Sequence, residues 1–114
     1  IDALQSSRIF VVSLGDFTLN NVTLKNGRTS STNGHGGAIQ FISSGLLTIQ
    51  DSVLTGNSTT GNAADGGAVF SNSGAITIIR STFSGNFTSD TGSDGGAIAT
   101  DFGPLTITSS TLSG

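Results

Sequence analysis

The chain has 114 residues, a formal net charge of −3 and only four basic side chains, so it lacks the positive surface that binds nucleic acid. It contains no cysteine and no run of 18 apolar residues, which excludes a disulfide framework and a membrane-spanning helix in this segment. A composition of 17 glycines and 10% charged residues also fits a disordered linker. Disorder, however, needs low hydrophobicity and high net charge, and here apolar residues recur at fixed spacing.

The chain consists of repeats that share the phrase Gly-Gly-Ala followed by Ile or Val. The alanine of this phrase recurs at Ala38, Ala68 and Ala97, which are almost evenly spaced. A fixed period of this size predicts a repeat architecture. A degenerate first copy aligns Ile9 with Ile39. We therefore expect one domain, 1–114, with rungs at approximately 8–37, 38–67, 68–96 and 97–114.

Each repeat predicts three short strands, because apolar residues alternate with polar ones and β-branched residues dominate. The first strands are expected at 9–13, 38–43, 68–72 and 97–101. A glycine follows each of them where a turn would need positive φ, namely Gly15, Gly45, Gly74 and Gly103. The second strands are expected at 17–19, 47–49, 76–78 and 105–107, and the third at 22–24, 52–54, 81–83 and 110–112. Polar loops at 26–36, 56–66 and 85–95 return the chain to the next repeat.

Three strands per repeat, with like residues in register, predict an all-β solenoid of about four three-stranded rungs of 29–30 residues. The expected fold is a right-handed parallel β-helix, because parallel crossovers are right-handed. A sandwich of hairpins is the alternative, but it needs tight turns and does not explain the period. The expected interior ladders are Ile9/Ile39/Val69/Ile98, Phe17/Leu47/Ile76/Leu105, Leu19/Ile49/Ile78/Ile107 and Leu24/Leu54/Phe83/Leu112.

The Gly-Gly-Ala-Ile phrase with a following Phe-x-x-Asn resembles the repeats of chlamydial polymorphic outer membrane proteins and of autotransporter-passenger-like bacterial surface proteins. The first motif is matched at 36–39, 66–69 and 95–98, and the second at 83–86 and, with Leu for Phe, at 54–57. The resemblance covers roughly residues 8–114 and implies a β-helix with a role in adhesion or surface display. It does not imply that this segment inserts into the outer membrane.

A calcium site is one hypothesis for the polar loops. Asp65 and Asp94 occupy the same position before the Gly-Gly pair, and His35 takes that position one rung earlier. Stacked loops would bring the two carboxylates close together, and Ca²⁺ held by them, by Asp90 and by loop carbonyls would remove their repulsion. The alternative is that these aspartates cap turns and no cofactor binds.

An outward-facing threonine ladder is expected because the middle residue of each second strand is threonine: Thr18, Thr48, Thr77 and Thr106. A second row, Thr23, Thr82 and Thr111, is broken by Val53. Regular threonine rows occur in ice-binding β-helices, but threonine also favours strands for its own sake. Phe10 and Phe70 are expected to point outward, where they would contact another fibril.

Other chemistry finds little support in the sequence. A polysaccharide-active enzyme needs clustered carboxylates or bases, whereas Arg8, Lys25, Arg28 and Arg80 share no ladder. Asp51 and Arg80 lie at equivalent positions and predict a surface ion pair. Three segments match the glycosylation pattern, at Asn21, Asn57 and Asn86, although asparagine there also suits a turn. We expect no enzyme activity.

The expected function is structural. Both end faces are predicted to be uncapped, which favours stacking of copies end to end or of adjacent repeats in a longer chain. Because the chain begins at Ile1, a longer parent is expected, and the stack would form a stiff stalk or an extracellular fibre at the cell surface. The alternative is an adhesin or binding module that recognises a glycan or host surface through its loops.

Overall fold

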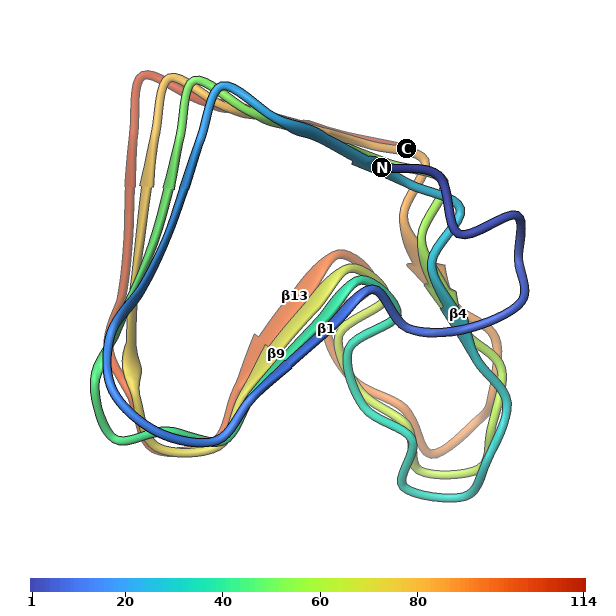
Figure 1. Cartoon of the computed structure of the whole chain (residues 1–114). Coiled ribbons are helices and arrows are strands. Elements are labelled where there is room, and N and C mark those ends of the chain that lie inside the picture. The colour runs from blue at the N-terminus through green and yellow to red at the C-terminus, as the bar shows by residue number, and fades with distance from the viewer.

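The computed structural model describes all 114 residues and contains 15 strands and no helix. Every strand pair is parallel, and the strands form four sheets. Figure 1 looks along the stack: the chain turns clockwise as it recedes from β1 at the front, so the superhelix is right-handed. The predicted right-handed parallel β-helix of about four rungs is confirmed.

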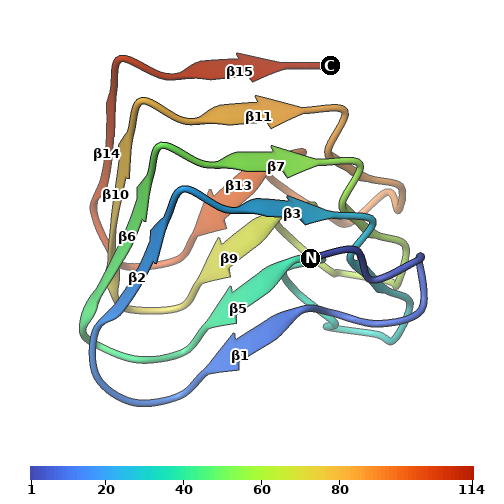
Figure 2. The same cartoon turned by 45° about the horizontal axis from the view of Figure 1, so that its top comes forward.

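Each rung contributes one strand to each of the first three sheets, and the first three rungs also contribute one strand to the fourth sheet. Figure 2 shows the rungs in order from β1–β3 to β13–β15. The first sheet contains β1 (Phe10–Val12), β5 (Ile39–Phe41), β9 (Val69–Ser71) and β13 (Ile98–Thr100). The second contains β2 (Phe17–Asn20), β6 (Leu46–Gln50), β10 (Ala75–Ile79) and β14 (Leu105–Thr108). The third contains β3 (Thr23–Lys25), β7 (Val53–Thr55), β11 (Thr82–Ser84) and β15 (Thr111–Ser113). The fourth contains β4 (Arg28–Thr29), β8 (Ser58–Thr59) and β12 (Phe87–Thr88).

The core cluster is built from side chains of the first three sheets, whose backbones surround the space seen in Figure 1. Inward side chains alternate with outward ones along each strand, and identical positions stack from rung to rung. Leu47 pairs with Ile76, which pairs with Leu105, and Leu54 and Leu112 flank Phe83 in the same way. In the second and third rungs these side chains are at most 1% exposed. Each buries enough apolar surface to contribute about 1.5–3 kcal/mol.

The first rung follows a different register from the predicted one. Phe10, not Ile9, pairs with Ile39, and Ile9 takes the position of Ala38 because both amides of Ile9 and Phe10 donate to the Ala38 carbonyl. The predicted ladder is therefore wrong by one residue at its first member. The rest of it, Ile39, Val69 and Ile98, is in register.

The fourth sheet lies inside the segments that were predicted to be polar loops without strands. We call the segments 26–37, 56–67 and 85–96 the lobes; they stack on one another beside the core (Figure 1). The Gly-Gly pair closes each lobe. Gly66 has φ of 65°, and a Cβ on Gly67 would overlap the carbonyl oxygen of Gly96 in the next rung. Both glycines are therefore required by the backbone.

The corner between the second and third sheets also uses a left-handed residue in every rung. Its members are Asn21 (φ 55°), Asp51 (49°), Arg80 (46°) and Ser109 (50°). The glycines after the first strands were predicted to have positive φ, but only Gly15 does. Gly45, Gly74 and Gly103 are needed for another reason, because a Cβ there would overlap backbone or side-chain atoms of a neighbouring rung.

Candidate functional site

The lobe corner before the Gly-Gly pair brings His35, Asp65 and Asp94 into one column. The ring Nδ1 of His35 accepts the amide N–H of Asp65 at 3.0 Å, and Asp65 Oδ1 accepts the amide N–H of Asp94 at 2.6 Å. Asp65 Oδ2 also lies 3.4 Å from His35 Nδ1. The side chains of His35 and Asp65 thus each cap the backbone of the next rung.

The Asp65 carboxylate already has a structural role, because it accepts the amide N–H of Asp94 in the next rung. The carboxylate of Asp90, the third residue of the calcium hypothesis, accepts the N–H of Gly92 at 3.3 Å within its own lobe. Nowhere does the structure gather three or more histidine, aspartate or glutamate side chains in a group that would hold a metal ion. Capping of turns by these aspartates, the alternative interpretation, fits the hydrogen bonds of Asp65 and Asp90, whereas the Asp94 side chain is exposed.

Phe70 is not available for a lateral contact. Its ring stacks on His35 with centroids 4.2 Å apart and planes at 19°, and the residue is only 2% exposed. Phe10 is half-buried and packs against Phe17 at 5.3 Å. Phe70 does occupy an outward position of the first sheet, in register with Gln40, but the lobe covers it. The first rung's register turns Phe10 toward the core cluster, so the predicted lateral contact with another fibril is wrong for both rings.

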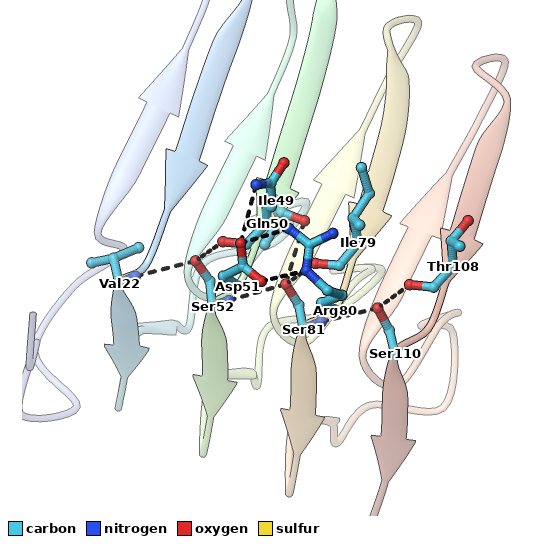
Figure 3. A network of polar contacts seen from close by, with 10 residues as sticks. All are labelled: Val22, Ile49, Gln50, Asp51, Ser52, Ile79, Arg80, Ser81, Thr108 and Ser110. Atoms are coloured by element: carbon cyan, nitrogen blue, oxygen red, sulfur yellow. Dashed lines mark hydrogen bonds and ion pairs between the residues drawn. The ribbon is translucent and has the colours of Figure 1, made fainter.

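At the corner between the second and third sheets, Asp51 forms a bidentate ion pair with Arg80 on the surface (Figure 3). Arg80 donates from Nε and Nη2 to the two carboxylate oxygens of Asp51, at 2.7 and 2.8 Å. Gln50 adds a third donor at 3.0 Å. The Arg80 hydrogen bonds, followed by that of Gln50, hold the pKa of Asp51 below its usual value. The predicted surface pair exists, and both residues are exposed.

A serine ladder lies directly behind this pair. Ser52, Ser81 and Ser110 each donate a hydroxyl to the carbonyl two residues earlier, at 2.7–2.9 Å. Each hydroxyl oxygen also accepts an amide from the preceding rung, as Ser81 Oγ does from Ser52 N–H at 3.1 Å (Figure 3). The sequence prediction placed these serines at strand starts and did not find this role, although their fixed period was the available signal.

The outward threonine ladder lies on the second sheet. Thr18, Thr48, Thr77 and Thr106 pair in register along it. The positions two residues further on hold Asn20, Gln50, Ile79 and Thr108, which share no chemistry. The neighbouring row on the third sheet holds Thr23, Val53, Thr82 and Thr111. The face therefore has one uniform threonine row.

Two of the three asparagines that match the glycosylation pattern are buried. Asn57 is fully buried and bonds the Gly27 amide, the Leu24 carbonyl and the Asn86 side chain at 2.8–3.2 Å. Asn86 repeats this arrangement one rung later with Asn57 N–H and Leu54 O. Asn21 alone is exposed. The left-handed residue of these turns is Asn21 itself in the first case, and the preceding glycine, Gly56 or Gly85, in the other two.

The two end faces of the stack differ. On the β13–β15 side, the core positions Leu105, Ile107 and Leu112 are 40%, 41% and 44% exposed. On the β1–β4 side, the third sheet carries an extra partner, because Asp2 pairs in parallel with Lys25. The expectation that both faces are uncapped is wrong for this part of the β1–β4 face.

The surface has no detected pocket, and no helix of the chain has the length and apolar character to cross a membrane. Comparisons with protein-family models, curated proteins and solved structures found no match. The resemblance to bacterial surface repeats therefore stays a prediction.

Proposed function

We propose that this chain is a structural repeat module of a secreted or cell-surface protein, whose rungs form a stiff stalk or an extracellular fibre by end-to-end stacking. One observation carries the proposal: the β13–β15 face repeats the register of the interior rungs and leaves its core ladders open. Leu105, Ile107 and Leu112 are 40%, 41% and 44% exposed, whereas their equivalents Ile76, Ile78 and Phe83 are buried.

This face also offers unpaired backbone groups at the correct spacing for another rung. The amide N–H groups of Gly95 and Gly96 have no partner, whereas those of Gly66 and Gly67 bond to the next rung at 3.0–3.3 Å. A further rung, from the same chain or from another copy, would extend all four sheets at about 4.8 Å per rung. Such a stack resists bending because every rung is bonded to its neighbours through several sheets at once.

The experiment adds one rung. Ser84 and Ser113 are equivalent positions of successive rungs, so a second copy of the segment 86–114 appended after Gly114 continues the register. We expect the appended rung to raise the free energy of unfolding, by about 1 kcal/mol for each half-exposed ladder side chain that it covers. Thermal unfolding measures the gain, and hydrogen exchange shows whether the β14 and β15 amides become protected.

The matched control appends the same segment with its residues in scrambled order. If the chain is a stalk module, the ordered extension should raise the unfolding midpoint and the scrambled extension should not. Equal midpoints for the ordered, scrambled and unextended chains, with no new protection in β14, would contradict linear growth of the stack.

A second candidate is the binding module, in which the lobes recognise a glycan or host surface. One observation favours it: Phe87 on β12 is 48% exposed and is an aromatic side chain on the lobe surface. Exposed aromatic rings stack on sugar faces. A glycan array probed with the intact chain tests this function, and Phe87→Ala should abolish any binding while leaving the unfolding midpoint within about 2 °C. Binding that survives the substitution would place the site elsewhere.

A further inference from the structure

The first eight residues retrace the path of a rung that has no lobe. Asp2 occupies the position of Lys25 in the next rung, and Ala3 N–H donates to Lys25 O at 3.0 Å as Asn26 N–H does to Thr55 O. Further along, Arg28 N–H donates to Ser7 O at 3.0 Å, which is the bond that Ser58 N–H makes to Gly27 O. Figure 2 shows this segment beside β3, on the side away from β7.

Arg8 alone then takes the place of ten lobe residues. Ser7 is equivalent to Gly27 and Ile9 to Ala38, so residues 28–37 have only Arg8 as their counterpart. The guanidinium is half-buried and reaches under the first lobe. Its Nε donates to the carbonyls of His35 and Gly36 at 3.1 and 2.9 Å, and its Nη2 donates to His35 O at 2.7 Å.

These two carbonyls identify what Arg8 replaces. In the next rung, the equivalent carbonyls of Asp65 and Gly66 accept the amides of Gly36 and Gly37 at 2.9 and 3.3 Å. On the first lobe, the Arg8 side chain supplies those donors. Arginine suits this task because its planar guanidinium presents several N–H donors in a fixed geometry and is always charged.

We propose that, in a chain that begins at Ile1, residues 1–8 act as a cap that prevents a second copy of this chain from adding to the β1–β4 face. The cap fills one layer under the third sheet and the lobe, so an incoming rung would contact it before reaching the free edges of β1 and β2. On the third sheet and the first lobe, polar groups that would template such a rung are already bonded, at Lys25, Arg28, His35 and Gly36. Asp2 holds the cap in place: its carboxylate accepts a hydrogen bond from Asn26 Nδ2 at 2.9 Å and forms an ion pair with Lys25 Nζ at 3.3 Å.

This inference rests on the proposed stacking function and adds that the stack grows in one direction. The stack grows from the β13–β15 face, and separate copies join head to tail only after the cap leaves. Pairing of two capped chains through their open faces would close the assembly at two copies, because a symmetric contact leaves no free face.

Sedimentation velocity across a wide concentration range tests the cap. The samples are the intact chain, Arg8→Ala, a variant that lacks residues 1–7 and carries Arg8→Ala, and the control Arg28→Ala. Arg28 is exposed and its guanidinium bonds only Thr60 Oγ1, at 3.4 Å, so its removal leaves the cap intact. We expect the intact chain and Arg28→Ala to stop at a dimer or smaller. The capless variant should form open-ended polymers with an axial repeat of about 4.8 Å in electron diffraction, and Arg8→Ala should associate more than the intact chain does.

Polymers of the intact chain, or a folded capless variant that associates no more than the intact chain, would overturn the cap. Should the capless variant fail to fold, hydrogen exchange on the intact chain decides. The amides of Lys25 and Arg28 must then be protected in dilute, monomeric samples, and rapid exchange at both rejects the cap. Failure of the stalk proposal is distinct, because it appears in the appended-rung experiment on the opposite face.

Discussion

Arg80 donates two hydrogen bonds to the carboxylate of Asp51 from the neighbouring rung, and both residues have left-handed backbone conformations. A left-handed conformation costs a non-glycine residue roughly 1–2 kcal/mol, with asparagine and aspartate affected least. Arginine has no such tolerance, so the strain of this pair is concentrated at Arg80. The ion pair, the Gln50 contact and the serine ladder behind it hold the corner in place.

The first prediction concerns pH. Since hydrogen bonds from Arg80 and Gln50 lower the pKa of Asp51, the folded state binds its proton less tightly than the unfolded chain does. The stabilisation is therefore present above the ordinary aspartate pKa of about 4 and is lost as the pH falls below it. Thermal unfolding from pH 7 to pH 2 should show the intact chain losing stability toward acid more steeply than Asp51→Asn.

The control for that prediction is Arg80→Gln, which removes the charge but keeps a long polar side chain. In this background the substitution Asp51→Asn should change the pH profile much less, because the main cause of the lowered pKa is gone. If Asp51→Asn changes the profile equally with and without Arg80→Gln, the pair does not set the acid sensitivity.

The second prediction compares two glycines. At Gly85, with φ of 58° and nothing within 4 Å of an added Cβ, alanine meets only conformational strain and should cost about 1–2 kcal/mol. At Gly67, alanine would overlap the carbonyl oxygens of Phe87 and Gly96, so its cost should be clearly larger than that of Gly85→Ala. Chemical denaturation of both variants measures the two losses, and equal losses would show that the lobes do not pack this closely.

The third prediction concerns the buried asparagines. Asn57→Ala leaves the Gly27 N–H and the Leu24 carbonyl without their side-chain partner in a buried place, which should cost about 1–3 kcal/mol for each group left unsatisfied. Asn62→Ala is the matched control, since Asn62 is exposed and its side chain forms no hydrogen bond. Chemical denaturation compares the two variants. We expect the control to stay within about 0.5 kcal/mol of the intact chain, and a similar loss in both would contradict the role of Asn57.

The fourth prediction concerns calcium. Asp65 already accepts the Asp94 amide, and no group of three candidate ligands surrounds it, so adding calcium or a chelator should leave the unfolding midpoint unchanged. The calcium hypothesis predicts the opposite: a midpoint that rises with calcium in the intact chain and not in Asp94→Asn. Electron microscopy with and without calcium would show whether the ion changes assembly.

The period of the sequence was sufficient to predict the rungs and most of their interior. Leu47, Ile76 and Leu105 recur at one constant interval, and a one-residue slip along a strand would turn them all to the solvent. The first rung lacks the Gly-Gly phrase, so nothing in its sequence distinguished Ile9 from Phe10 as the partner of Ile39. Only the observed hydrogen bonds to Ala38 decide between them.

Two features could not be predicted from the sequence, the strands of the fourth sheet and the cap, and each has a physical reason. Arg28–Thr29 and Phe87–Thr88 are two-residue strands, too short to show alternation. Arg8 caps backbone carbonyls of a lobe that is distant in the sequence, and such contacts follow from the closed superhelix, not from local sequence. The same applies to Phe70, which is buried under the His35 ring of the first lobe, 35 residues earlier in the sequence.

The stacked lobes have a consequence for engineering. Their tips, near Asn33, Asn62 and Thr91, are exposed and tolerate the kind of change that exposed loop tips accept. Neighbouring tips are separated by about one strand spacing, roughly 4.8 Å, whereas a grafted helix is about 10 Å wide. A foreign peptide with helical structure would therefore fit on every second or third tip at most, and grafts on adjacent tips would collide.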